Sequence, residues 1–116
     1  MKFKLIVAVV SDAKTEIVVD TARHCGGTGS TVITNVRGEG LKPSSTFLGL
    51  TLEGQRDIVL LVVEEHMSRH ILEEICQAAR FDEDLGSGVA FQIDIEDAVG
   101  LTSQIKEIEK EIEEEI

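Results

Sequence analysis

The sequence predicts an α+β fold, a ferredoxin-like split βαβ sandwich (βαββαβ) with an extra C-terminal helix, assembled as a homo-oligomer. Two β-α-β units of similar length follow one another along the 116 residues. Their strands are rich in β-branched residues and their helices carry apolar stripes. Two of the strands are apolar on both faces, but no further helix pair is available to cover the second face. Copies of the chain are therefore expected to pack sheet against sheet.

The first unit begins with Lys2–Val10, an apolar run predicted to be a strand. The helix that follows is expected to be capped by Ser11 or Asp12 and to end at Gly26-Gly27, where left-handed geometry costs little. Thr31–Val36 is predicted to be the second strand. The apolar face of the helix is predicted to hold four residues: Ile17, Val18, Ala22 and Cys25.

Arg37–Gln55 is predicted to be a long loop between the two units. It holds four glycines, the one proline of the chain and a pair of serines. A loop of more than about 12–15 residues in a compact domain is usually functional or mobile. The length of this segment therefore predicts a functional or mobile loop.

The second unit begins with Asp57–Val63, a strand with six consecutive apolar residues. His66–Ala79 is predicted to be a helix, Phe81–Gly88 an acidic loop, and Val89–Ile95 a strand with one polar face. The predicted apolar stripe of the helix consists of Met67, Ile71, Leu72, Ile75 and Ala79.

Two parts of the chain are distinguished by composition: a domain over residues 1–101 and an acidic amphipathic helix over 102–116. The helix carries one seam of isoleucines, through which it is expected to pack on its own subunit. The alternatives are a coiled coil of three such helices and a helix that covers a cleft. The seam consists of Ile105, Ile108, Ile112 and Ile116.

Charge and composition exclude several classes of function. The net charge is −11, and residues 61–116 carry sixteen acidic side chains against four basic ones. An acid excess opposes binding to a phosphate backbone, and the four aromatic residues give few platforms for base stacking. No nucleic acid or direct lipid binding is expected. Two cysteines and the absence of a long apolar run predict a cytoplasmic protein.

No pattern typical of catalysis is present, so no enzyme is expected. The spacing of Gly26–Gly40 fits neither a Walker loop nor a dinucleotide fingerprint. His66 and His70 share a helix face and are weak candidates for a metal site, although a solvated helix start is the simpler interpretation. His24 is expected to favour a helix C-terminus, and the thiols of Cys25 and Cys76 are expected in the core.

The order of these segments resembles the PII-like signal-transduction proteins over about residues 4–101. The resemblance rests on the opening strand KLIVAVV, then GSTVITNVRGEG before a long loop, the Gly-Ser-Gly turn and the segment IEDAVGL. It implies a homotrimer of ferredoxin-like subunits that binds AMP, ADP or ATP between subunits. It also implies a loop that docks on a partner, such as a membrane transporter or a metabolic enzyme.

The resemblance assigns site residues one by one. Thr31 matches the family's threonine near the base, and Arg56 matches a basic residue at the start of the third strand. Gly38 and Gly40 match the glycines at the start of the loop. The turn whose amides hold phosphates in the family corresponds to Gly86, Ser87 and Gly88. The effector loop implied by the resemblance includes Arg37, Lys42, Ser44, Ser45 and Phe47.

The sequence also departs from the family pattern. Val89 stands where the family usually has lysine, Val99-Gly100 replaces an arginine pair, and Asp82-Glu83-Asp84 places acids beside the expected phosphate site. A mono- or diphosphate, a cyclic nucleotide, a metal-bridged ligand and no nucleotide all stay as alternatives. Two other functions are also kept: a trimeric metal- or ion-tolerance protein of related fold, and an interaction module without a ligand.

Overall fold

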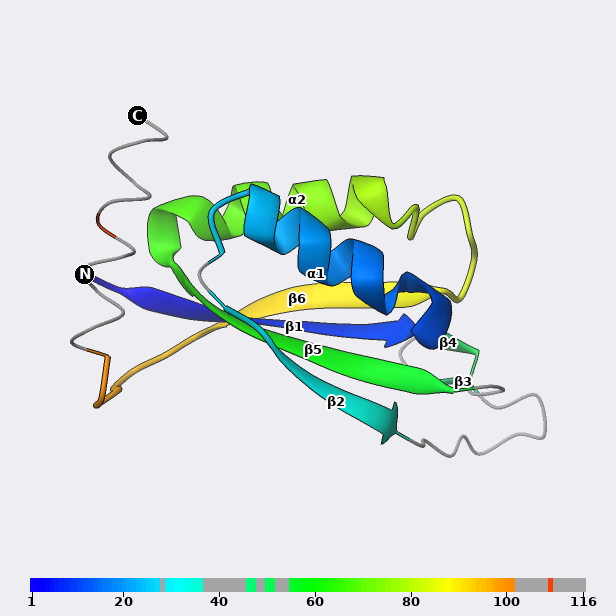
Figure 1. Cartoon of the computed structure of the whole chain (residues 1–116), viewed down its shortest axis with the longest axis horizontal. Coiled ribbons are helices and arrows are strands. Elements are labelled where there is room, and N and C mark those ends of the chain that lie inside the picture. The colour runs from blue at the N-terminus through cyan, green and yellow to red at the C-terminus, as the bar shows by residue number, and fades with distance from the viewer. Residues whose placement is uncertain (28, 37–45, 48–49, 52–54, 102–108, 110–116) are drawn as a thin grey trace.

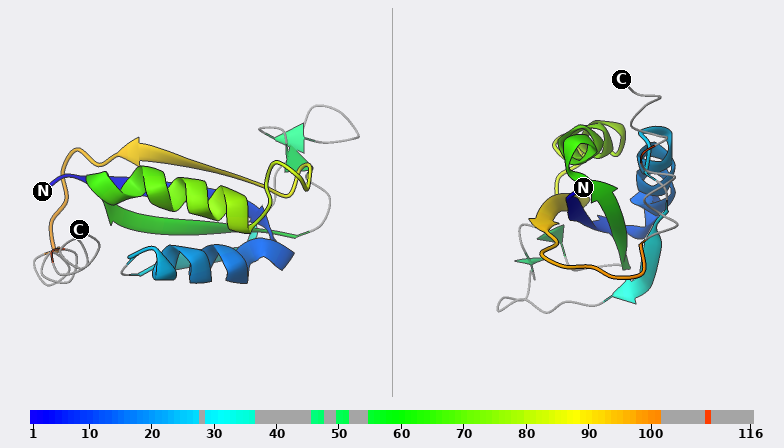
Figure 2. Two further views of the ribbon diagram at one scale, coloured as in Figure 1. Left: turned by 90° about the horizontal axis from the view of Figure 1, so that it is seen from above. Right: turned by 90° about the vertical axis from the view of Figure 1, so that its left-hand side faces the viewer.

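The centre of the molecule is a four-stranded antiparallel sheet in the order β2-β5-β1-β6. The structure is a computed structural model, which describes residues 1–27, 29–36, 46–47, 50–51, 55–101 and 109. Helices α1 and α2 both lie on one face of this sheet (Figures 1 and 2). This is the predicted ferredoxin-like arrangement. The elements are β1 (Phe3–Ser11), α1 (Thr15–His24), β2 (Thr31–Val36), β5 (Arg56–Glu64), α2 (Glu65–Ala78) and β6 (Gly88–Asp94).

Helix α1 follows β1 through a short 3-10 helix, η1 (Asp12–Lys14). Ser11 caps η1, because its Oγ accepts the amide of Ala13 at 3.4 Å. The prediction that Ser11 or Asp12 caps the helix itself is wrong for α1, whose N-cap is Lys14 and which has no side-chain capping hydrogen bond. At the other end of α1 the amide of Gly27 donates to the carbonyl of Ala22 at 2.8 Å. Val18 and Ala22 are buried, but Ile17 is 40% exposed. The prediction of a buried Ile17 is wrong, because each residue turns about 100° round the helix and only Val18 and Ala22 face the sheet squarely.

The predicted uninterrupted loop over Arg37–Gln55 is also wrong at four residues. Two short strands lie within it, β3 (Thr46–Phe47) and β4 (Leu50–Thr51), which pair antiparallel with each other. Threonine and phenylalanine favour extended backbone, whereas the glycines around them favour a loop, and the loop was predicted.

The core lies between the two helices and the covered face of the sheet. Ile6, Val59 and Leu61 contribute from the central strands, and Ile71 and Ile75 from α2. The predicted stripe of α2 is confirmed, with Met67 and Leu72 packed at its margin. Two residues were not predicted there. Ser68 is buried, and its hydroxyl is satisfied there because Oγ donates to the carbonyl of Glu65 at 3.0 Å. Phe81, which was predicted to lie in a loop, packs into the core.

The face of the sheet opposite the helices is apolar and is covered by neither helix. We call it the open face. The register shows that the polar Gln92 of β6 shares the helix-covered face with Ile6, whereas Phe91 and Ile93 share the open face with Val7 and Leu5. Phe91 is 39% and Ile93 49% exposed. A contiguous apolar surface of this kind marks an interaction site. Its members are Leu5, Val7, Val9, Ile58, Leu60, Val62, Val89, Phe91 and Ile93.

The C-terminal part of the predicted organisation lies largely outside the described residues. The domain boundary at residue 101 and the acidic helix over 102–116 therefore stay predictions. Among the helices that the structure describes, none has the length and apolar character needed to cross a bilayer.

Candidate functional site

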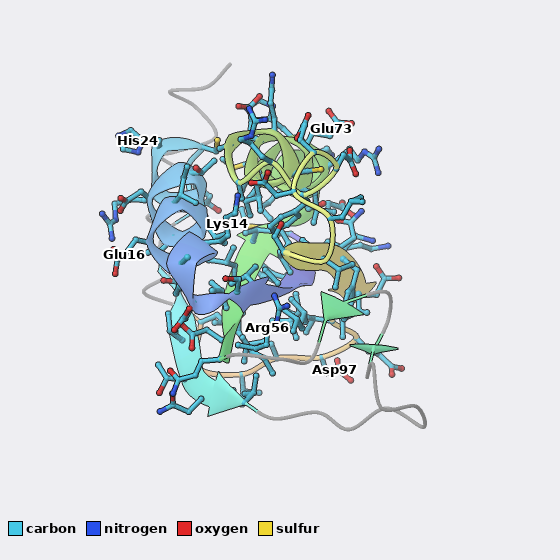
Figure 3. The ribbon with its side chains drawn as sticks, turned by 90° about the vertical axis from the view of Figure 1, so that its right-hand side faces the viewer. Lys14, Glu16, His24, Arg56, Glu73 and Asp97 are labelled. Carbon is cyan, nitrogen blue, oxygen red and sulfur yellow. The ribbon has the colours of Figure 1, made fainter. Side chains whose placement is uncertain are left out.

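The end of the sheet at which β1 finishes and β5 and β6 begin gathers several of the predicted site residues (Figure 3). The Ser87 carbonyl accepts two hydrogen bonds there, from the amide of Ser11 at 2.8 Å and from Nη1 of Arg56 at 3.3 Å. Arg56 is only 7% exposed. The structure thus brings Arg56 together with the turn formed by Gly86, Ser87 and Gly88, which we call the glycine turn.

Backbone geometry explains the first glycine of the glycine turn. Gly86 has φ of 73°, in the left-handed region that side chains disfavour. The amide of Ser87 then donates to the carbonyl of Asp84 at 3.1 Å. The Oγ of Ser87 is buried and has no hydrogen-bond partner within the described part of the chain. A buried hydroxyl beside a guanidinium offers donors of the kind that bind anionic oxygens.

Packing, rather than access for a ligand, explains the last glycine of the glycine turn. A Cβ at Gly88 would lie 2.8 Å from Cδ1 and from Cζ of Phe81, whose ring is buried in the core. The resemblance implies a glycine here because a ligand approaches closely. The structure gives Gly88 a different requirement, which is room for an aromatic ring.

Two of the three acids beside the glycine turn have partners in their own chain. Lys14 Nζ donates to Asp84 at 2.5 Å and to the carbonyl of Ala79 at 2.6 Å. The hydrogen bond and charge of Lys14 lower the pKa of Asp84. Asp82 accepts from the thiol of Cys76 at 3.5 Å. Burial of the thiol and its hydrogen bond to Asp82 raise the pKa of Cys76.

These contacts reduce the repulsion that three acids would exert on an anion. Asp84 is neutralised by a close cation, and the cation comes from η1, about seventy residues earlier in the sequence. Lys14 was not predicted from the sequence as part of this region. Its only signal was a basic residue near a predicted helix start, where an acidic residue is usually preferred.

Thr31 lies apart from the other predicted site residues. It pairs with Leu60 at the start of the edge strand β2, on the open face and exposed. Leu60 lies four positions beyond Arg56 along β5, which is about 13 Å at the usual rise of about 3.3 Å per residue. A ligand that contacts Thr31 and Arg56 of the same chain must therefore span about 13 Å.

The remaining predicted residues of the loop lie mostly outside the described residues. This applies to Gly38 and Gly40 of the nucleotide site and to Arg37, Lys42, Ser44 and Ser45 of the effector loop. Phe47 lies in β3. The roles assigned to these residues stay predictions.

Two of the three histidines, His24 and His66, lie at helix ends, whereas His70 lies inside α2. Glu64 is 3% exposed and caps α2, since its carboxylate accepts the amide of His66 at 2.8 Å and also contacts the ring Nδ1 of His66. Ligand-type atoms of Glu64, Glu65 and His66 lie within 4.8 Å of one another, and His70 is not in this group. The ring of His24 contacts the carbonyl of Asp20 at 2.7 Å, near the C-terminus of α1, as predicted.

The cysteines are also explained by packing. Cys25 and Cys76 are both partly buried and pack against the core cluster, as predicted. The raised pKa of Cys76 keeps its thiol protonated at neutral pH. Neither position indicates a nucleophile.

Comparison with solved structures finds many with the same fold. CPII bound to ADP, AMP and acetate, from Thiomonas intermedia K12, is 26% identical, with a TM-score of 0.63 over 81% of this chain and 86% of that chain. CPII bound to ADP and bicarbonate, from the same organism, is 25% identical, with a TM-score of 0.62 over 82% and 87%. A PII-like signaling protein from Thermus thermophilus is 21% identical, with a TM-score of 0.61 over 82% and 88%, and shows the shared fold.

Comparison of the sequence with protein families gives a match over nearly the whole described domain. No curated protein matches the sequence. The family model for nitrogen regulatory protein P-II matches residues 3–104, which include both helices, the four-stranded sheet and the glycine turn. Together with the ferredoxin-like sheet, this match shows that the chain belongs to the nitrogen regulatory protein P-II family.

Proposed function

We propose that this chain is a homotrimeric cytoplasmic signalling protein, and not an enzyme, which binds an adenine nucleotide between subunits. Occupancy of that site would set the conformation of residues 37–55, and this segment would dock on a membrane transporter or a metabolic enzyme.

The contact between Arg56 and Ser87 is the observation that carries the proposal. A nearly buried guanidinium lies 3.3 Å from the carbonyl of a glycine turn whose hydroxyl is buried and unpartnered among the described residues. A phosphate oxygen placed here would accept charge-assisted hydrogen bonds from the guanidinium and a neutral one from the hydroxyl. The pairing of Asp84 with Lys14 lessens the opposing negative charge.

The open face supports a site shared between subunits. Thr31 and Arg56 both lie on that face by register, but about 13 Å apart along the sheet. If a second copy covers the open face, its Thr31 can approach the glycine turn of the first copy. A site shared between two chains would then bring Thr31 and Arg56 together without a ligand that spans this separation on one chain.

The size of the phosphate chain follows from the residues that are missing. Val89 and Val99-Gly100 provide no cation where the family usually has three. Each missing charge-assisted contact removes about 1.5–3 kcal/mol from binding. We therefore propose ADP or AMP as the ligand in preference to ATP. CPII, 26% identical, is bound to ADP, AMP and acetate.

Isothermal titration calorimetry tests this proposal with AMP, ADP, ATP and cyclic AMP, each with and without bicarbonate. At least one of them is expected to bind with a saturable heat. Arg56→Gln is expected to weaken that binding by about 10-fold or more, because a charged hydrogen bond to phosphate is lost. Arg69→Gln is the matched control, since Arg69 is exposed on α2 and pairs with Glu73 of its own helix.

Two results would count against the proposal. Absence of any saturable binding by the wild type would exclude the sensor function. Equal weakening by Arg56→Gln and Arg69→Gln would place the ligand elsewhere. Circular dichroism of both variants confirms that any loss of binding is not a loss of folding.

A further inference from the structure

Asp57 is a buried carboxylate that the proposed nucleotide site does not use. It is 7% exposed and lies beside Val10 in the sheet register, on the helix-covered face. Oδ2 accepts the hydroxyl of Thr15, the first residue of α1, at 2.6 Å. Oδ1 accepts the backbone amide of Asn35, near the end of β2, at 3.4 Å. One carboxylate thus joins the start of a helix to the end of an edge strand.

The amide that Asp57 accepts belongs to the most unusual backbone position in β2. Asn35 has φ of 60°, in the left-handed region. The pairing of β2 with β5 shifts register between Ile33 and Val36, so Asn35 lies in a bulge. A bulge re-aims the chain that follows it. The chain that follows is the predicted effector segment, residues 37–55.

The preceding residue, Arg56, contacts the glycine turn from the opposite face of the sheet. Val36 pairs with Arg56 directly after the bulge. The same arginine donates to the Ser87 carbonyl. Arg56 and Asp57, at consecutive positions of one strand, therefore contact the glycine turn on one face of the sheet and the bulge on the other.

We propose that Asp57 is a positioning residue that holds the Asn35 bulge and so sets the direction in which residues 37–55 leave the sheet. A ligand that draws the Arg56 guanidinium away from Ser87 shifts the start of β5, and Asp57 passes this shift to the bulge. The second step rests on the proposed function, whereas the first does not.

Amide hydrogen exchange of Asn35 in the ligand-free protein tests the first step. Asp57→Ala is expected to raise the exchange rate of this amide by about 10-fold or more, because it loses its acceptor. Asp57→Asn is expected to restore slow exchange, since its side-chain oxygen accepts the amide and its NH2 donates to Thr15. The amide of Val32, four strand positions from Val36 and paired with Val59, is the internal control.

A second variant keeps the test decisive if Asp57→Ala does not fold. Thr15→Val removes only the hydroxyl that orients the carboxylate, and Thr15→Ser restores it. Thr15→Val is expected to raise the Asn35 exchange rate by several-fold, and Thr15→Ser to leave it at the wild-type value. Unchanged exchange of Asn35 in both Asp57→Ala and Thr15→Val would overturn the positioning role.

A fluorescent reporter tests the second step. The chain has no Trp and no Tyr, so Phe47→Trp places a sole indole in residues 37–55. ADP is expected to change its emission in the Asp57 background and in Asp57→Asn, but not in Asp57→Ala, while the calorimetric affinity for ADP changes less than about 3-fold. A full emission response in Asp57→Ala would overturn the coupling. Failure of the wild type to bind any of the four nucleotides would refute the proposed function and this coupling together, and the exchange experiment would still decide the role of Asp57.

Discussion

Gly88 is the residue whose role changes most between the sequence and the structure. Its place in a Gly-Ser-Gly motif predicts close approach of a ligand, whereas in the fold its missing Cβ makes room for the buried ring of Phe81. Both requirements favour glycine, and a pattern of glycines alone does not distinguish them. Gly86 is different, because its φ of 73° requires glycine whatever lies nearby.

Substitution of Gly88 by alanine is predicted to destabilise the fold by about 1–3 kcal/mol, the usual cost of overpacking a core. Phe81→Leu in the same chain should recover part of this loss, since the smaller side chain vacates the ring position. Gly29→Ala is the control, because a Cβ there meets no atom within 4 Å. Denaturation by guanidinium, followed by circular dichroism, measures all three. Equal stability of Gly88→Ala and Gly29→Ala would contradict the packing argument.

The candidate site was predicted from the sequence only in part, for a physical reason. Arg56 and the glycine turn were predicted from motif order, and the structure brings them together. Lys14 and Asp57 were missed because each acts through a partner more than twenty residues away in sequence, which no local pattern reveals. The charged pair Arg56-Asp57 ahead of an apolar strand was the one local sign of a buried polar position.

At the scale of elements, the links between them are formed by side chains at their ends. Lys14 of η1 contacts the last turn of α2 through the Ala79 carbonyl, and it contacts the following turn through Asp84. A cation at a helix C-terminus is favourable, because the last carbonyls lack partners within the helix. The bridge thus fastens the start of α1 to the segment that leads into the glycine turn.

This bridge is predicted to make stability depend on pH at the acidic end. The pKa of Asp84 is lowered from 3.8 by the Lys14 hydrogen bond and charge. The contribution of the pair is therefore present above 3.8 and is lost as the pH falls through the lower pKa of the folded protein. Lys14→Met should return the pKa of Asp84 toward 3.8 in a carboxyl NMR titration.

Asp94 is the internal control for that titration. Its pKa is lowered by the hydrogen bond and charge of Lys4 rather than of Lys14. It should therefore keep its lowered pKa in Lys14→Met. A common shift of both aspartates would point to a general change in the fold and not to loss of one pair.

The elements themselves were largely predictable, because apolar period and β-branched content report directly on burial. The strands and both helices are observed within about two residues of their predicted bounds. The exceptions are local. The hairpin of β3 and β4 lies among glycines, which favour a loop. Phe81 follows the end of α2, where the sequence also favours a loop, but its ring is buried in the core.

At the scale of the whole molecule, the open face dominates. The sheet has large apolar residues on both sides, but both helices lie on one side (Figure 2). The apolar residues of β6 belong to the open face, so its predicted polar face is the one beneath the helices, where Gln92 lies. This arrangement favours a subunit that completes its burial by association.

Phe91→Glu is predicted to break the proposed trimer. The wild type should have a mass in solution of three times 12.7 kDa by light scattering, and the variant should approach the mass of one chain. A carboxylate within an apolar interface is costly to bury when no cation or donor pairs with it. Ile17→Glu is the matched control, since Ile17 is 40% exposed against 39% for Phe91 but lies on α1. An unchanged mass for Phe91→Glu would exclude the open face as the interface.

The distance between Thr31 and Arg56 has a consequence for mixed populations of subunits. Under the proposed arrangement each chain contributes one half to each of two different sites. A chain with Thr31 altered and a chain with Arg56 altered would each be defective alone. Mixed assemblies would nevertheless contain a site built from the intact half of each chain, so that two inactive alleles would complement one another in one cell.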